Sequence, residues 1–134
     1  MKQRILSTFF VLMYLATLGL SAAYAAGAAP RSNSDLKSAF SSGRKTIVFF
    51  QNPMGGPCRA QNEILQKLHT DRGKKFNIVY IDASKEENQK VFYDYGVRGL
   101  PSLVAVDSSG NIGKVFAPGI QSYETLGQVL DSLK

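Results

Sequence analysis

Continuous apolar runs alternate along this chain with segments in which apolar residues recur every three or four positions. Thr46–Phe50 contains only β-branched and aromatic residues. Such runs are typical of strands buried on both faces at the centre of an α/β sheet. Phe76–Ile81 predicts a second buried strand. Leu103–Val106 predicts a third, and a turn at residues 107–111 joins it to a hairpin partner, Ile112–Phe116.

The three- and four-residue spacing predicts four helices around these strands. Serines that can accept hydrogen bonds from the first helical amides are the expected N-caps of three of them: Ser34, Ser84 and Ser122. The remaining helix runs from Pro57 to about Thr70, with Pro57 in its first turn, where its missing N–H costs nothing.

The resulting element order is α–β–α–β–α–β–β–α. The helical crossover between the first two strands predicts that they are parallel, and the hairpin makes the last two antiparallel. We therefore expect an α/β fold in which helices cover both faces of a central mixed β-sheet.

The N-terminal segment has the pattern of a secretory signal peptide. Lys2 and Arg4 precede an uncharged apolar stretch, and Ala23-Tyr24-Ala25 offers small residues at the positions that a signal peptidase recognises. We expect cleavage after Ala25, export to the periplasm or secretion, and no stable membrane anchor afterwards. An uncleaved anchor is the alternative, but the apolar run is short for a membrane span. The predicted organisation is a signal peptide at 1–25, a flexible leader at 26–33 and one domain at 34–134.

Charge and composition narrow the function classes. Sixteen basic and ten acidic residues give a net charge of +6, but the basic residues are scattered and form no block with interleaved aromatic residues. This pattern indicates a solvated basic surface and excludes a nucleic-acid partner. Cys58 and His69 fall at opposite ends of one predicted helix, which makes a poor metal site. We expect neither a metal nor a cofactor.

A single cysteine in an exported chain cannot form an internal disulfide. It is then either buried and inert, paired with another molecule, or chemically used. Cys58 follows Gly55-Gly56-Pro57 at the start of a predicted helix. Exposed amides at a helix N-terminus favour a thiolate, which is the nucleophile in thiol–disulfide exchange.

Two motifs resemble the thioredoxin-like superfamily. Gly55-Gly56-Pro57-Cys58 resembles its Cys-Gly-Pro-Cys motif, with glycine in place of the first cysteine. Residues 95–103 resemble the segment in which that superfamily carries an active-site cis-proline, which would be Pro101. The resemblance covers roughly Asp35 to Lys134 and implies a thioredoxin-like fold.

The departures from this superfamily concern its chemistry. Cys58 matches the second, resolving cysteine, and Gly55 replaces the nucleophile. Met54 stands where the family has tryptophan, and Phe49 and Ile78 replace its buried acid–lysine pair. One chain therefore lacks the two thiols that dithiol–disulfide turnover requires.

The leading hypothesis is monothiol chemistry, in which Cys58 forms a mixed disulfide with a protein or peptide thiol or disulfide partner. The resemblance implies that Leu100 and Pro101 present the partner chain beside Met54 and the two residues before the cysteine, Gly56 and Pro57. Because glycine at 55 covers nothing, we expect Cys58 to be more exposed than in the family. A disulfide-linked homodimer through Cys58 is a further expectation.

The alternative hypothesis is a non-catalytic module that binds peptide or protein through the same surface. A peroxide-reducing role is the weakest of the three, because the loop before Cys58 contains no hydroxyl residue. The sequence leaves these functions open, because they depend on whether the remaining thiol is reachable.

Overall fold

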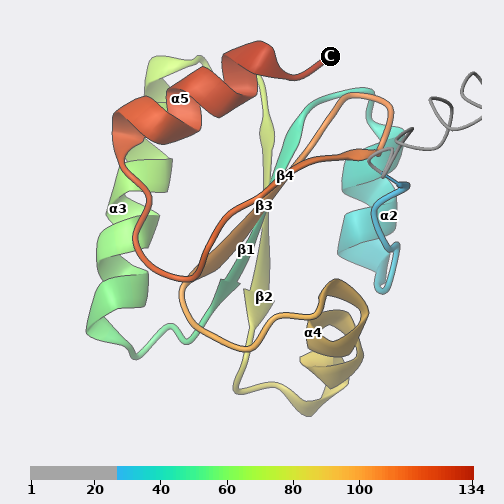
Figure 1. Cartoon of the computed structure of the whole chain (residues 1–134), viewed down its shortest axis with the longest axis vertical. Coiled ribbons are helices and arrows are strands. Elements are labelled where there is room, and N and C mark those ends of the chain that lie inside the picture. The colour runs from blue at the N-terminus through green and yellow to red at the C-terminus, as the bar shows by residue number, and fades with distance from the viewer. Residues whose placement is uncertain (1–26) are drawn as a thin grey trace, which may run out of the picture.

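The computed structural model describes residues 27–134, which contain a four-stranded sheet flanked by helices. The predicted signal peptide lies outside these residues. Figure 1 shows α3 and α5 on one side of the sheet and α2 and α4 on the other. The mixed α/β fold is therefore confirmed. The elements, in chain order, are α2 (Ser34–Ser41), β1 (Thr46–Gln51), α3 (Gly56–Asp71), β2 (Asn77–Asp82), the 3-10 turn η1 (Glu86–Asn88), α4 (Gln89–Tyr95), β3 (Ser102–Val106), β4 (Ile112–Val115) and α5 (Tyr123–Ser132).

The strand order across the sheet is β2-β1-β3-β4. β1 pairs with β2 in parallel, and Thr46 lies opposite Asn77. β1 and β3 are antiparallel, as are β3 and β4. The parallel crossover and the hairpin are thus both as predicted.

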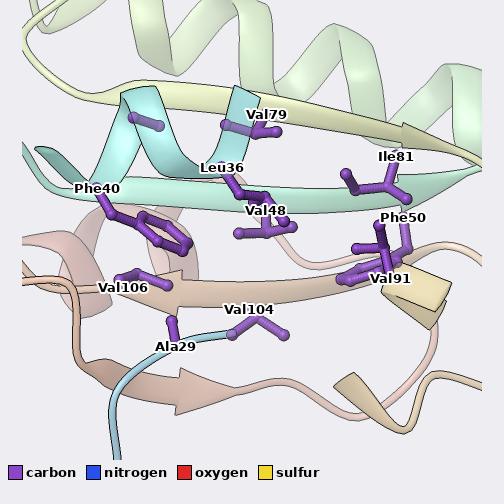
Figure 2. Close-up of a cluster of buried hydrophobic side chains, with 11 residues drawn as sticks. Ala29, Leu36, Phe40, Val48, Phe50, Val79, Ile81, Val91, Val104 and Val106 are labelled. Carbon is purple, nitrogen blue, oxygen red and sulfur yellow. The ribbon is translucent and has the colours of Figure 1, made fainter. Parts of the chain in front are cut away.

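Alternation along β1 divides the apolar core into two layers. Val48 and Phe50 pack with α2 and α4, whereas Ile47 and Phe49 pack with α3 and α5. Figure 2 shows the first layer, in which Leu36 from α2 points toward the sheet. Because both faces of β1 are covered, the whole run had to be apolar.

β2 differs from the sequence prediction. Only Val79 and Ile81 are fully buried in this strand, and Tyr80 is 37% exposed. β2 pairs with β1 alone among the described residues, so it forms an edge of the sheet. The prediction of a buried strand is confirmed at Val79 and Ile81 and is wrong at Tyr80, because an apolar run does not distinguish a central strand from an edge strand with one open side.

Two predicted helix caps also differ. Asn33, not Ser34, caps α2, and its side chain accepts a hydrogen bond from the Leu36 amide at 2.9 Å. Ser84 does not cap the next helix. Its amide and hydroxyl donate to Asp82 Oδ1, which forms a turn before η1. Polar residues adjacent in sequence compete for these local roles, so the cap position shifts between them.

The segment before α2 is packed against the domain, in contrast to the expected flexible leader at 26–33. Ala29 is buried in the core layer of Figure 2, and its amide donates to Gly110 O at 2.9 Å. Tyr95 donates its hydroxyl to Pro30 O at 2.8 Å. The segment also pairs with the start of β4, where the Ile112 amide donates to Gly27 O at 3.0 Å. No helix among residues 27–134 has the length and hydropathy needed to cross a membrane.

Candidate functional site

The two motif loops meet at one end of the sheet. Phe50 of β1 lies opposite Ser102 of β3 in the antiparallel register. The loop that leaves β1 and the loop that enters β3 at Pro101 therefore start from neighbouring positions. This places Cys58, at the start of α3, and Pro101 on the same edge of the molecule.

Cys58 lies in the first turn of α3, and the sequence around it explains this position. Gly55 is the N-cap residue, and Pro57 occupies the first turn, where its fixed φ suits a helix start. The Arg59 amide donates to Gly55 O at 3.0 Å and begins the helical hydrogen bonds. The local sequence thus sets the cysteine at the amino end of a helix.

The thiol of Cys58 is buried. The residue is 3% exposed and belongs to the core layer that contains Phe49 and Phe116. The Asn52 amide donates a hydrogen bond to its sulfur at 3.4 Å. The expectation that Gly55 leaves this cysteine more exposed is wrong, because the loop backbone itself covers the sulfur.

The loop before Cys58 passes close to its sulfur. A Cβ atom built on Gly55 would lie 3.9 Å from Cys58 Sγ and 3.3 Å from the backbone oxygen of Asn52. Most residues of the covering loop are themselves exposed: Asn52, Pro53, Met54, Gly56 and Pro57. The thiol therefore lies one layer below the surface.

Pro101 is buried and follows a cis peptide bond with Leu100. Its carbonyl accepts a hydrogen bond from the Gly119 amide at 2.9 Å. Ser102 donates its hydroxyl to Gly99 O at 2.5 Å. The loop before β3 is thus braced from both sides, and Leu100 remains at its surface.

Gln61 is a site-supporting residue that the sequence analysis did not assign to this role. It lies one turn after Cys58 on α3 and is fully buried. Its Nε2 donates to Gln121 O at 3.2 Å, and its Oε1 accepts from the Gln121 amide at 2.6 Å. This two-way bond joins α3 to the loop that contacts Pro101. A polar residue on the apolar face of a predicted helix was the available signal.

Exposed apolar side chains occur on the loops that surround the thiol. Met54 is 82% exposed, Leu100 37% and Ile120 48%. Ile120 neighbours Gly119 and Gln121, which contact the proline loop and α3, and it was not predicted. A contiguous apolar patch marks a surface that binds a partner, whereas single exposed apolar side chains are ordinary.

The pair of positions that carries a buried acid and lysine in the resembled superfamily is apolar here. Phe49 is fully buried, and its ring meets Tyr80 in an edge arrangement, with ring centroids 5.7 Å apart. Ile78 is partly buried beside the same layer. Neither side chain can accept or donate the proton of a thiol.

Residues 27–134 contain no group of three or more His, Cys, Asp or Glu side chains placed to hold a metal ion. Their buried side-chain polar atoms all have hydrogen-bond partners. Cys58 is the free thiol at this edge; its sulfur accepts from the Asn52 amide, and the residue belongs to an apolar core layer.

Residues 32–134 match the family model described as a thioredoxin-like domain. Thioredoxin from Staphylococcus epidermidis is 31% identical over 99 residues, which cover 74% of this chain and 90% of that protein. The structure of a mutant thioredoxin from Halobacterium salinarum aligns with a TM-score of 0.65 and 25% identity, covering 75% of this chain and 84% of that one.

The exposed lipoprotein thioredoxin of Streptococcus pneumoniae is similar in fold, with a TM-score of 0.60 at 18% identity over 73% of this chain and 90% of its own. Together, the family match and the relatives support a thiol–disulfide redox function in general terms.

Proposed function

This chain belongs to the thioredoxin-like domain family, and from that membership we propose that it reacts with thiols or disulfides of polypeptide partners through one sulfur, that of Cys58. The observation that carries the proposal is the position of this thiol. It lies in the first turn of α3 and is separated from solvent by a loop of exposed residues with no side chain at Gly55.

The burial of Cys58 determines how such a reaction would begin. At 3% exposure the sulfur cannot meet a second sulfur in line unless residues 52–57 move. Local opening of short loops costs far less than global unfolding. Binding of a partner across Met54 and Leu100, both exposed, would bring it against this loop. A disulfide between two copies through Cys58 would need the same opening.

The step balances as a single exchange. The thiolate of Cys58 attacks a partner disulfide, a bond forms between its Sγ and one partner sulfur, and the other sulfur leaves as a thiolate. Since position 55 supplies no thiol, release of the partner from this mixed disulfide requires a second thiol from the partner or from a small molecule. The protein would therefore hold mixed disulfides longer than a dithiol relative does.

Mixed-disulfide trapping tests this proposal. The native protein is incubated with a small aliphatic disulfide or with a peptide that carries one activated cysteine, and the intact mass is measured. We expect an adduct that maps to Cys58 and is lost in a Cys58→Ser variant. Absence of any adduct from the folded protein would contradict the proposal.

A second candidate function is a binding module without redox activity, and the burial of Cys58 in the core layer favours it. In this case the Met54, Leu100 and Ile120 surface alone would hold the partner. Peptide binding that is unchanged in Cys58→Ser but weakened in Met54→Glu identifies this function. Loss of binding in Cys58→Ser would instead assign the affinity to the covalent adduct.

We also propose that the protein is exported after removal of residues 1–25, so that it works in a compartment where disulfides persist. The charged start, the apolar stretch and the Ala23-Tyr24-Ala25 site support this. Expression of the full chain in an exporting bacterium should yield a protein whose first residue is Ala26. Retention of Met1 in the membrane fraction would contradict it.

A further inference from the structure

The open edge of β2 is a part of the fold that the proposed function does not use. In the parallel pair, the amides of Asn77 and Ala83 donate to backbone oxygens of Lys45 and Gln51, each at 2.8 Å. Alternate residues of a strand direct their backbone groups to the same side. The N–H and C=O groups of Ile78, Tyr80 and Asp82 therefore point away from β1.

Most of this outward edge is unpaired. Asp82 O accepts hydrogen bonds from Asn88 Nδ2 at 3.0 Å and from the Lys85 amide at 3.3 Å. Nothing in residues 27–134 bonds to the backbone groups of Ile78 or Tyr80. Their N–H and C=O groups form a short segment ready for pairing.

The edge lies in an open groove of about 660 Å³. One wall is formed by Asp35 and Ser38 of α2 and by Ser42, which follows this helix, and His69 of α3 also lines the groove. The Tyr80 side chain is held against α3, since its hydroxyl donates to Asn62 Oδ1 at 2.8 Å and Gln66 donates to it. It therefore leaves the backbone accessible.

Charge is distributed unevenly along this groove. The end near the start of β2 carries Arg44 and Lys74. The end near Tyr80 carries a cluster of mainly acidic residues: Asp35, Asp82 and Glu87, with Lys85 among them. An identical strand in the reverse direction would bring each charged end against the opposite charge.

We propose that the occupant of this edge is a second copy of this chain, with the two β2 strands antiparallel about a two-fold axis at Val79. In this register Ile78 of one copy faces Tyr80 of the other, and each pair exchanges two backbone hydrogen bonds. All four unpaired groups of each strand are then satisfied. The contact is isologous, so it closes at a dimer.

In the proposed dimer, the two Cys58 sites lie at opposite ends of the extended sheet. Because β1 and β2 are parallel, the loop that leads to Cys58 lies at the carboxyl end of both strands. Reversing the second copy sends its site to the opposite end of the extended sheet. Both Cys58 sites would remain free to bind partners.

The test is sedimentation analysis of the full chain, expressed with its N-terminal segment in an exporting host and kept under reductant so that no disulfide forms. We expect a monomer–dimer equilibrium between micromolar and millimolar concentrations. The amides of Ile78 and Tyr80 should exchange more slowly with deuterium as concentration rises. A monomer at every concentration would overturn the proposal, as would protection of these amides that does not depend on concentration.

Charge variants test the register. Asp35→Arg and Arg44→Asp should each raise the dimer dissociation constant at least about tenfold. The double variant should return this constant nearly to that of the unmodified protein, because close charge pairs across an interface couple strongly. Glu124→Arg is the matched control, since Glu124 is also an exposed acid in the first turn of a helix. Circular dichroism checks that each variant is folded. Additive effects in the double variant, or equal effects of Asp35→Arg and the control, would overturn it.

Discussion

A Cβ atom on Gly55 would lie 3.9 Å from the Cβ of Cys58. Disulfide-bonded cysteines hold their Cβ atoms about 3.8 Å apart, so this chain keeps the backbone geometry of a two-cysteine site with one thiol missing. The φ of Gly55 is −79°, which any residue can adopt. The dihedral angle therefore admits other residues, and the loop backbone must shift by a few tenths of an ångström to relieve the 3.3 Å contact of such a Cβ with Asn52 O.

The Gly55→Cys variant should consequently form an intrachain disulfide with Cys58. Oxidation should lower the intact mass by two hydrogens, and the reduced variant should gain the ability to reduce a disulfide-bonded peptide. Gly56→Cys is the matched control, because a Cβ at Gly56 has no neighbour within 4 Å and so does not reach Cys58. Failure of Gly55→Cys to close the disulfide would show that the site has diverged beyond its nucleophile.

Gln61 should contribute to stability through its bonds to Gln121. The Gln61→Ala variant leaves the part-buried amide and carbonyl of Gln121 without their partner, which costs about 1–3 kcal/mol of unfolding free energy. The amides of Gly119 and Gln121 should also exchange faster with deuterium. Gln128→Ala, at an exposed glutamine of α5, serves as control. Equal losses in the two variants would contradict this role for Gln61.

Phe49→Asp should destabilise the domain by at least about 3 kcal/mol, because it removes a fully buried ring and introduces an unpaired carboxyl. Burial would raise the folded-state pKa of that carboxyl above its unfolded value. The added cost therefore grows as pH rises through the unfolded pKa of about 4 and is smallest below it. Urea unfolding at several pH values measures this, and Phe49→Asn should lack the pH dependence. A pH-independent loss in Phe49→Asp would contradict the account.

The contacts of Asp94 should hold the segment before α2 in a pH-dependent manner. Lys90, and then the hydroxyl of Ser32, keep the pKa of this carboxyl below its ordinary value. The stabilisation that the Asp94 carboxylate supplies is therefore present above the unfolded pKa of about 4. It is lost as pH falls through the lower pKa of the folded state. The amide signal of Ala29 in NMR spectra should shift over that range, and Asp94→Asn should remove the transition. An unchanged transition in the variant would assign it to another group.

Much of the fold followed from the sequence, because the apolar runs and helical periodicities are local signals. The runs at Thr46–Phe50 and Leu103–Val106 became buried neighbouring strands as expected. The edge position of β2 was not predictable in this way, since it depends on which strands pair across the sheet. The packing of Ala29 likewise depends on a long-range bridge from Ala28 to Asn111.

The positions of the candidate site residues were predicted in part. The motifs located Cys58 and Pro101, and the register of β1 with β3 explains why their loops adjoin. The burial of Cys58 was missed, because it depends on the path of the loop backbone rather than on the side chain at Gly55. The role of Gln61 was missed because its partner, Gln121, is sixty residues away in the chain.

The reaction rate of Cys58 with a thiol probe at increasing sub-denaturing urea concentrations tests the central claim most directly. If residues 52–57 open locally, the rate in the folded protein should be nearly independent of urea and faster than global unfolding allows. If the rate instead rises with urea in step with the falling free energy of unfolding, the thiol is reached only in the unfolded chain. That result would contradict a reactive Cys58 and leave the binding module as the function.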